Sequence, residues 1–227
     1  MTCSCRNYET MGIDRSFSGM LTVADRTALR SAATRVEYAP GSVICHQGDP
    51  SRNVLVVSHG RVKVSRFTAT GEENVLAVRG PGEIIGELSA VDGGCRTASL
   101  VAVDRVCGLV LTAQALEKLC HARPAVAWAL LRVVVSRHRA TSDQQDLRTG
   151  PSLYRVGAVL LNLAHREADD MIATVPLSQR ELAGIVGMSR ETLVRCLKVL
   201  REAGIIRTRR NGVQILREEE LRSMCGI

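Results

Sequence analysis

The residues with the clearest chemical potential lie near the end of the chain. Arg190, Glu191 and Arg195 are expected on a helix that starts after Ser189, a residue type that caps helices. An arginine guanidinium can donate to guanine O6 and N7, and a glutamate carboxylate can accept from the cytosine amino group. An exposed acid is otherwise unfavourable beside phosphates, so Glu191 is the most informative of the three. The pattern predicts readout of base edges in the major groove of DNA.

Two short helices separated by a tight turn are predicted around these residues. Ser178 and Glu181 have the spacing of a capping box, so a helix is expected over Gln179–Val186. Gly187 should end this helix, because glycine readily adopts the left-handed conformation found at such ends. A second helix is then expected from Arg190 to about Ala203, where another glycine stops it.

The remaining residues of this region complete the motif. At 100° per residue, the leucines of the second helix form one buried face: Leu193, Leu197 and Leu200. Beyond the helix, residues 205–210 and 213–216 are expected as strands joined at Asn211-Gly212, a strong signal for a two-residue hairpin turn. Two helices with a glycine turn, followed by a hairpin, predict a winged helix-turn-helix.

Positive charge is concentrated in the same region. Residues 178–217 hold nine Arg or Lys and three acids, a local charge of +6, whereas all 227 residues carry a net charge of +7. A basic block in an otherwise balanced chain indicates a surface that binds a polyanion. The alternative is a solvated surface with chance clustering, in which Glu191 pairs with Arg195 one helical turn away.

The first half of the chain has a different pattern. Short β-rich runs alternate with turns such as Gly80-Pro81-Gly82, and this spacing predicts an antiparallel sandwich or roll. A short helix is expected before the strands, from a capping box at Thr22 and Asp25 to about Thr34. The expected strands are Val43–His46, Val54–Ser58, Val62–Phe67, Val75–Val78, Ile84–Ile85, Ser99–Val103 and Val106–Leu111.

A long helix is expected to follow, starting at Pro124, because proline suits the first turn of a helix. Steps of four and three residues predict a heptad seam through which two copies of the chain pair. The alternative is an amphipathic helix packed on its own β domain. The seam positions are Val126, Leu130, Val133, Arg137, Ala140, Gln144 and Leu147.

These patterns divide the chain into four parts and indicate an α+β protein. We expect an N-terminal arm (residues 1–20), a β domain (21–123), the long helix (124–149) and a C-terminal DNA-binding domain (150–227). Another helix is expected from Ser152 to Ala168, after the boundary at Gly150-Pro151.

The segment from Leu177 to Leu200, LSQRELAGIVGMSRETLVRCLKVL, resembles the DNA-binding signature of the cyclic AMP receptor protein/FNR family. The resemblance implies an antiparallel β-roll that binds a cyclic nucleotide, a long dimerisation helix and a winged helix-turn-helix. It implies that Arg190, Glu191 and Arg195 read bases in palindromic DNA with GTGA-type half-sites. Val194 stands at a variable position that could touch a thymine methyl group. The candidates for phosphate contacts are Ser178, Arg180, Ser189, Thr192 and Lys198.

The segment 86–98, GELSAVDGGCRTA, resembles the phosphate-binding cassette of cyclic-nucleotide domains and implies cyclic AMP as the effector. Gly86 would let the backbone approach the ligand, and Arg96 would give the phosphate a charge-assisted contact together with Thr97. Glu87 would accept from the ribose 2′-hydroxyl. The family often has proline where this chain has Cys95, which leaves the turn less rigid.

The long helix supplies the rest of the implied pocket. Thr141-Ser142 follow Pro124 by the interval of an adenine-contacting pair in the family, and Arg137 matches a family arginine near the pocket. The complete implied ligand set is Gly86, Glu87, Leu88, Arg96, Thr97, Arg137, Thr141 and Ser142.

Several other classes of protein are disfavoured. Eight cysteines are too few for a disulfide scaffold, and Cys3-x-Cys5 is too short for an ordinary structural zinc site, so no metal is expected. Without an 18-residue apolar run or a secretory signal, we expect a cytoplasmic protein that does not bind a membrane. No paired carboxylates or nucleophile–base arrangement indicates an enzyme.

The leading hypothesis is a homodimeric transcription regulator switched by cyclic AMP, with double-stranded DNA and RNA polymerase as partners. One alternative keeps DNA binding and changes the switch to another nucleotide such as cyclic di-GMP, to a redox signal or to no ligand. Another is a cyclic-nucleotide-binding module that regulates a protein partner, which the winged helix-turn-helix disfavours.

Overall fold

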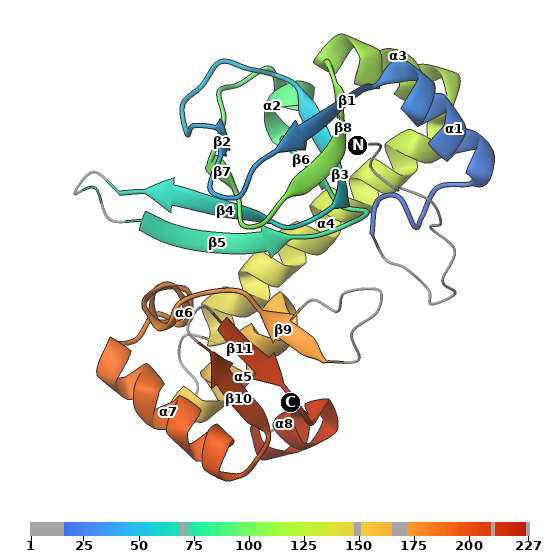
Figure 1. Cartoon of the computed structure of the whole chain (residues 1–227). Helices are drawn as coiled ribbons and strands as arrows, with labels where there is room; N and C mark the ends of the chain where they lie inside the picture. The colour runs from blue at the N-terminus through green and yellow to red at the C-terminus, as the bar shows by residue number, and fades with distance from the viewer. Residues whose placement is uncertain are drawn as a thin grey trace.

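Two four-stranded antiparallel sheets form a β-roll in the first half of the chain (Figure 1). The computed structural model describes residues 16–68, 71, 73–147, 151–164, 172–209 and 212–225, with the backbone alone for residues 141–147. The strand orders are β1-β8-β3-β6 and β2-β7-β4-β5. The strands are β1 (Thr34–Tyr38), β2 (Val43–Cys45), β3 (Val54–His59), β4 (Val62–Phe67), β5 (Glu73–Arg79), β6 (Ile84–Ile85), β7 (Ser99–Ala102) and β8 (Val106–Leu111).

Strand β3 lies at the centre of the roll and is covered on both faces. Val54 and Val56 pack in one cluster with the surrounding helices, whereas Leu55 and Val57 pack in the cluster inside the roll. Because alternate residues of a strand point to opposite faces, this double covering accounts for the continuous apolar run in the sequence.

Four helices belong to this half of the chain: α1 (Val23–Ala32), α2 (Glu87–Asp92), α3 (Ala113–Ala122) and α4 (Pro124–Leu147). The Thr22 hydroxyl accepts from the Asp25 N–H, as the sequence predicts, and α1 ends before β1 begins. Phe17 is fully buried in the cluster that joins these helices to the roll. The end of the expected arm is therefore part of the β domain, and residues 1–15 of that arm lie outside the described residues.

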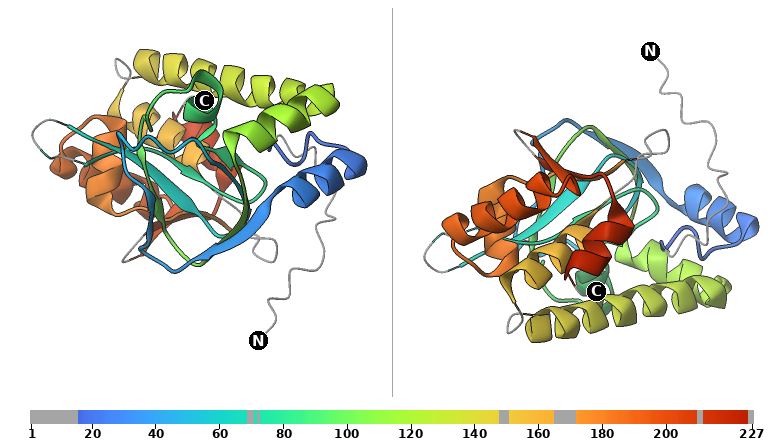
Figure 2. Two further views of the ribbon diagram at one scale, coloured as in Figure 1. Left: turned by 90° about the horizontal axis from the view of Figure 1, so that it is seen from above. Right: turned by 90° about the horizontal axis from the view of Figure 1, so that it is seen from below.

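The first positions of the predicted seam of α4 face the chain's own β domain rather than a second copy, and the side chains of its last two positions, Gln144 and Leu147, lie outside what the structure describes. Val126, Leu130 and Val133 are buried against the chain's own β domain, so the alternative of an amphipathic packing helix describes this face. The opposite face is open: the side chains of Trp128, Leu131 and Val135 are 64%, 48% and 42% exposed. Figure 2 shows α4 running along one side of the molecule.

The described part of the C-terminal domain contains four helices and a three-stranded antiparallel sheet of order β10-β11-β9. Its elements are α5 (Ser152–Leu163), β9 (Ala173–Val175), α6 (Gln179–Val186), α7 (Arg190–Glu202), β10 (Ile206–Arg209), β11 (Gly212–Ile215) and α8 (Glu218–Cys225). Leu193, Leu197 and Leu200 are buried in its core, as predicted. Helix α5 ends at Leu163 rather than at Ala168, and the expected boundary at Gly150 and the turn residue Asn211 lie outside the described residues.

The α+β architecture, the roll and the winged helix-turn-helix are confirmed, and most predicted strands agree within one or two residues. The elements that the sequence pattern did not predict are β1, α2, α3, β9 and α8. β1 is a largely exposed strand with charged residues such as Arg35 and Glu37, so it has little apolar alternation to reveal it.

The C-terminal domain packs directly on strand β5 of the roll. Val75 and Val78 of β5 are buried in the same cluster as Leu163 of α5 and Leu182 of α6. At the edge of this contact, Lys63 Nζ of β4 lies 2.9 Å from Glu181 Oε1 of α6.

Within the described part of the chain, no single helix is long and apolar enough to span a membrane. The segments Ala113–Ala122 and Pro124–Ala140, which are bent relative to each other, reach the required length and apolar composition when they are taken together.

Candidate ligand pocket and nucleic-acid interface

A cavity of about 350 Å³ lies where the roll, α4 and α5 meet. The roll supplies β5 and the cassette residues Gly86–Ser89 and Arg96–Ala98, and α4 supplies Ser136, Arg137 and Ala140. The lining combines apolar side chains with a few charged and polar ones, which is the composition of small-molecule sites.

Gly86 begins the cassette and must be glycine for two reasons. Its φ is +81°, in the left-handed region that disfavours other residues. A Cβ at this position would collide with the Arg96 guanidinium and would lie 2.9 Å from the Asn53 carbonyl oxygen. The close approach predicted for Gly86 is therefore, in this structure, an approach to the protein's own side chain.

Arg96 is buried and organises the cassette. Its Nε donates to Ser51 Oγ at 3.0 Å, Nη1 donates to the Gly86 carbonyl and to Ser89 Oγ at 3.0 and 2.9 Å, and Nη2 donates to the Asn53 carbonyl at 2.5 Å. A guanidinium has five N–H groups. Within the described residues, four of them are used, and one Nη2–H is left for a ligand.

Glu87 and Arg137 meet across the pocket wall. Arg137 Nη1 of α4 donates to Glu87 Oε1 at 2.8 Å, and its Nη2 donates to the Ile84 carbonyl at 2.7 Å. Glu87 is only 6% exposed. This ion pair fixes the long helix to the segment that lines the pocket. Nearby, burial lowers the pKa of Arg79, and the charge of Arg137 lowers it further.

The structure brings most of the predicted ligand set together. Gly86, Glu87, Leu88, Arg96, Thr97 and Arg137 all line the cavity. Helix α4 continues through Thr141 and Ser142, but their side chains lie outside what the structure describes. Sequence reasoning missed the residues that hold Arg96, namely Ser51, Asn53 and Ser89, and it missed the two contributions from α5, Asn162 and Leu163.

Lys63 and Glu181 form a partly buried ion pair between the two domains. Burial alone would raise the pKa of Glu181, but hydrogen bonds from Lys63 and Ser178 hold it below its usual value. Burial alone would lower the pKa of Lys63, but its bonds to Glu181 and Glu73 raise it. Both groups are therefore charged at neutral pH, and their attraction favours the docked arrangement.

The helix-turn-helix has the predicted caps. Ser178 and Glu181 form a reciprocal capping box, Gly187 ends α6 with a φ of 69°, and the Ser189 hydroxyl accepts from the Thr192 N–H. Sequence reasoning missed Arg155 of α5, whose Nη2 donates to the carbonyls of Val186 and Gly187 at the end of α6.

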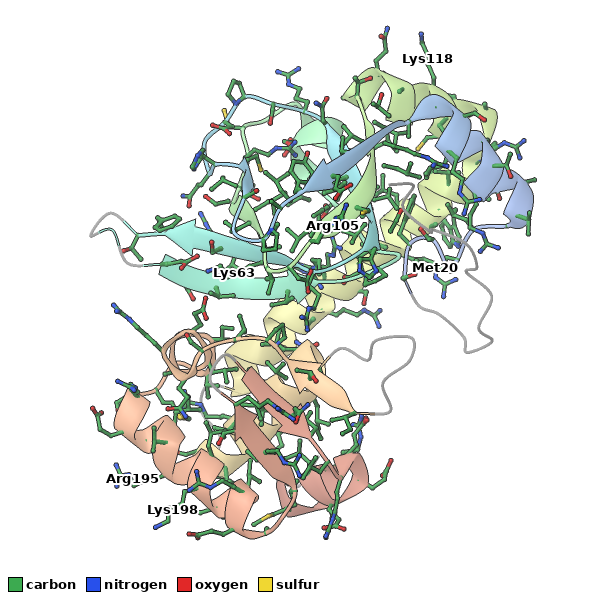
Figure 3. All side chains as sticks on the ribbon, viewed as in Figure 1. Met20, Lys63, Arg105, Lys118, Arg195 and Lys198 are labelled. Atoms are coloured by element: carbon green, nitrogen blue, oxygen red, sulfur yellow. The ribbon has the colours of Figure 1, made fainter. Side chains whose placement is uncertain are left out.

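Helix α7 presents its predicted base-reading residues to solvent. Arg190, Glu191 and Arg195 are exposed, and Figure 3 shows Arg195 and Lys198 pointing away from the domain. Hydrogen bonds from its own backbone N–H and from the Ser189 hydroxyl lower the pKa of Glu191, so it is an ionised acceptor at neutral pH. Among the described side chains, no ion pair links Glu191 to Arg195, which weakens the alternative of a self-paired surface.

The residues predicted to contact phosphates differ in their exposure to solvent. Arg180, Ser189 and Lys198 are exposed, whereas Thr192 is half-buried. Ser178 is half-buried, and its hydroxyl already donates to Glu181 Oε2 at 2.7 Å. Ser178 is thus primarily a helix cap in this structure.

Neither metal ligation nor thiol pairing is seen in the described residues: no group of three His, Cys, Asp or Glu could hold a metal ion there. Burial raises the pKa of the thiols of Cys45, Cys120, Cys196 and Cys225, which keeps them protonated at neutral pH. Cys3 and Cys5 lie outside the described residues.

Comparisons with known proteins agree with both halves of this architecture. A family model described as a cyclic nucleotide-binding domain matches residues 35–123, and one described as a Crp-like helix-turn-helix domain matches residues 154–224. These ranges contain the cassette and the helices α6 and α7.

Two relatives are similar over most of the chain. The CRP-like cAMP-activated global transcriptional regulator of Mycobacterium tuberculosis is 33% identical over 199 residues, 86% of this chain and 89% of the relative. The cyclic AMP receptor protein of Thermus thermophilus is 34% identical over 179 residues, 78% of this chain and 82% of the relative.

A solved structure of the c-di-GMP responsive global regulator CLP from Xanthomonas campestris has a TM-score of 0.69 and 22% identity, covering 86% of this chain and 99% of that one. At this identity the likeness shows a shared fold.

Replacing Gly86 with alanine should damage the cassette more than backbone strain alone explains. The matched control is Gly41→Ala, at a similar φ of +79° but with nothing within 4 Å of the added Cβ. The control should lose about 1–2 kcal/mol of unfolding free energy. Gly86→Ala should lose about 1–3 kcal/mol more, because its methyl group overlaps Arg96. Urea unfolding measures both, and equal losses would contradict the crowding described here.

Acidification should weaken the contact between Lys63 and Glu181. Because the folded-state pKa of Glu181 is lowered from 4.5, its stabilisation is complete above the unfolded value and is lost as the pH falls through the folded one. Glu181→Gln keeps a capping-box residue but cannot titrate. Its unfolding free energy should fall less than that of the wild type between neutral pH and a pH of about 3. If urea titrations gave the same pH dependence of the unfolding free energy for Glu181→Gln and the wild type, the result would argue against a stabilising pair of Lys63 with Glu181.

Proposed function

Because this chain belongs to the Crp/Fnr family of transcriptional regulators, we propose that its nucleotide pocket binds cyclic AMP and that binding controls recognition of palindromic DNA. The chain is a cyclic-nucleotide-binding, DNA-binding regulator. The two relatives described above, which match this chain over most of their own length, are regulators rather than enzymes. The observation that carries the proposal is one cavity that joins the cassette, helix α4 and the C-terminal domain.

The proposed ligand contacts follow from the charges of the pocket. The guanidinium of Arg96 bonds only neutral oxygens within the described residues, so its positive charge favours the cyclic phosphate. Thr97 is exposed on the cavity wall and can donate its hydroxyl to the phosphate. Glu87 can accept from the ribose 2′-hydroxyl while it keeps its bond to Arg137. The base would then extend along α4, toward Ala140 and the Thr141-Ser142 pair.

DNA recognition is proposed for the exposed side of α7. Arg190 and Arg195 can each fork onto a guanine, and the ionised Glu191 can accept from a cytosine amino group. GTGA-type half-sites, about one helical turn or 34 Å apart, suit two such helices in a symmetric dimer.

We also propose that the dimer forms through the exposed face of α4. Trp128, Leu131 and Val135 make an apolar stripe that no part of the described chain covers. Since Arg137 on the same helix reaches into the pocket, a ligand can bias the position of this helix by binding one arrangement better than another. RNA polymerase as a partner and a cytoplasmic location remain part of the same proposal.

A second candidate keeps the DNA-binding function and changes the effector. The fold is shared with CLP, which is described as c-di-GMP responsive. A redox switch would have to act through Cys95, the thiol that is exposed among the described cysteines, because burial raises the pKa of the thiols of Cys45, Cys120, Cys196 and Cys225. Calorimetric titration of the protein with cyclic AMP, cyclic GMP and cyclic di-GMP separates the effectors.

Thr97→Ala should weaken cyclic AMP binding about tenfold or more, because a hydrogen bond to a charged group contributes roughly 1.5–3 kcal/mol. Thr27→Ala, on α1 of the same domain, is the matched control and should bind normally. Calorimetry gives both affinities. Wild-type protein that binds operator DNA equally with and without saturating cyclic AMP would disprove the proposed switch.

Arg195→Ala should weaken specific DNA binding by about 1–3 kcal/mol and relax the preference for one base position. Arg30→Ala, a surface arginine of α1 in the β domain, should change neither quantity. Selection from a randomised DNA library, followed by affinity measurements, tests both variants. An unchanged selected sequence for Arg195→Ala would refute its role in base reading.

The double variant Leu131→Asp with Val135→Asp should sediment as a folded monomer, because two carboxylates would be placed in an apolar interface. The matched variant Leu130→Asp with Val133→Asp should instead unfold the β domain, since both positions are buried inside one chain. Analytical ultracentrifugation and circular dichroism distinguish these outcomes. A dimer of normal mass for the first variant would place the interface elsewhere.

A further inference from the structure

The C-terminal domain contributes directly to the wall of the nucleotide pocket. Asn162 and Leu163, at the end of α5, line the cavity beside β5 and α4. Leu163 is buried with Val75 and Val78 of β5, and this packing holds the end of α5 against the roll. The C-terminal domain therefore forms part of the ligand site as well as the DNA-facing surface.

Asn162 has an amide group that no other described residue engages. It is exposed although it borders the cavity. Among the described residues, its side chain has no hydrogen-bond partner. An amide offers both a donor and an acceptor to a ligand, whereas its neighbour Leu163 offers only apolar surface.

The order of residues along α4 places Asn162 at the base end of the pocket. Arg137 bonds Glu87, which marks the ribose and phosphate end. Ala140 lines the cavity about 4.5 Å further along the helix, in the direction in which α4 runs toward the C-terminal domain that carries Asn162 (Figure 1). A nucleotide whose phosphate lies at Arg96 would thus direct its base toward Asn162.

We propose that Asn162 reads the base of the bound cyclic nucleotide and favours adenine. This inference rests on the proposed function, because it assumes that a cyclic nucleotide occupies the cavity. An asparagine amide matches the adenine edge, since its oxygen accepts from N6–H while its nitrogen donates to N7. The DNA-binding domain then selects the effector that controls it.

The contact exists only while the C-terminal domain is docked on β5. That docking is held by the buried Val75 and Val78 and by the ion pair of Lys63 with Glu181. Lys63 itself does not line the cavity. A ligand that bonds Asn162 stabilises the docked arrangement by the free energy of that bond, and docking raises ligand affinity by the same factor.

Calorimetry of the full chain with cyclic AMP and cyclic IMP tests this proposal, because cyclic IMP has an oxygen in place of the 6-amino group. Wild-type protein should prefer cyclic AMP. Asn162→Ala should weaken cyclic AMP binding on the order of threefold to tenfold and should reduce the preference between the two nucleotides. Gln114→Ala is the matched control, because it removes an exposed amide from α3, which does not line the cavity. It should bind both nucleotides normally.

A double-mutant cycle tests the link to docking. Lys63→Met should weaken cyclic AMP binding in the wild-type background and have little further effect in Asn162→Ala. Wild-type protein that binds cyclic AMP while Asn162→Ala keeps the same affinity and base preference would overturn this inference and leave the proposed function intact. A wild-type chain that binds no cyclic nucleotide would overturn both. Thermal unfolding of Asn162→Ala should match the wild type, since the side chain is exposed.

Discussion

The ligand pocket depends on the hydrogen bonds of one buried guanidinium, that of Arg96. Arg96 draws together parts of the chain that are distant in sequence, because its donors reach Ser51, Asn53, Gly86 and Ser89. All of these acceptors are neutral oxygens, so the hydrogen bonds satisfy the guanidinium without cancelling its charge. A buried charge without a counter-ion is unfavourable by itself. Under the proposed function, the phosphate of the effector would relieve this cost, so that the same residue would serve as a structural cross-link and as an electrostatic attractor for the ligand.

Helix α4 connects the pocket that holds Arg96 to the rest of the molecule, because its faces contact different surroundings. One face is buried in the β domain through Val126 and Val133. Further along the same face, Arg137 reaches the pocket, and its pairing with Glu87 ties the helix to the cassette. The opposite face exposes Trp128 and Leu131. A shift of the helix must alter all three environments together, since a helix with intact backbone hydrogen bonds moves as a rigid body.

Local signals in the sequence predicted much of this structure, and non-local contacts account for what they missed. The capping box of Ser178 with Glu181 could be read from adjacent residues, because capping uses bonds within one helical turn. The seam of α4 was misassigned because periodicity shows that a face is buried without showing what buries it. The charged Arg137 at a seam position is the residue that argues against an apolar dimer seam, since its partner is a carboxylate of the same chain. Asn162 could not be found at all, because α5 reaches the pocket only through tertiary packing.

Strand β5 lines the ligand pocket and also packs in the core of the C-terminal domain. Val78 lines the nucleotide pocket and is also buried in the core of the C-terminal domain. The β4–β5 pairing shifts register between Val64 and Ser65, where Leu76 is left unpaired, and Ala77 and Val78 after it are both buried. Under the proposed function, a substitution at Val78 would therefore change both the fit of the effector and the docking of the C-terminal domain. A change of effector preference along this strand would then require compensating changes in α5 and α6.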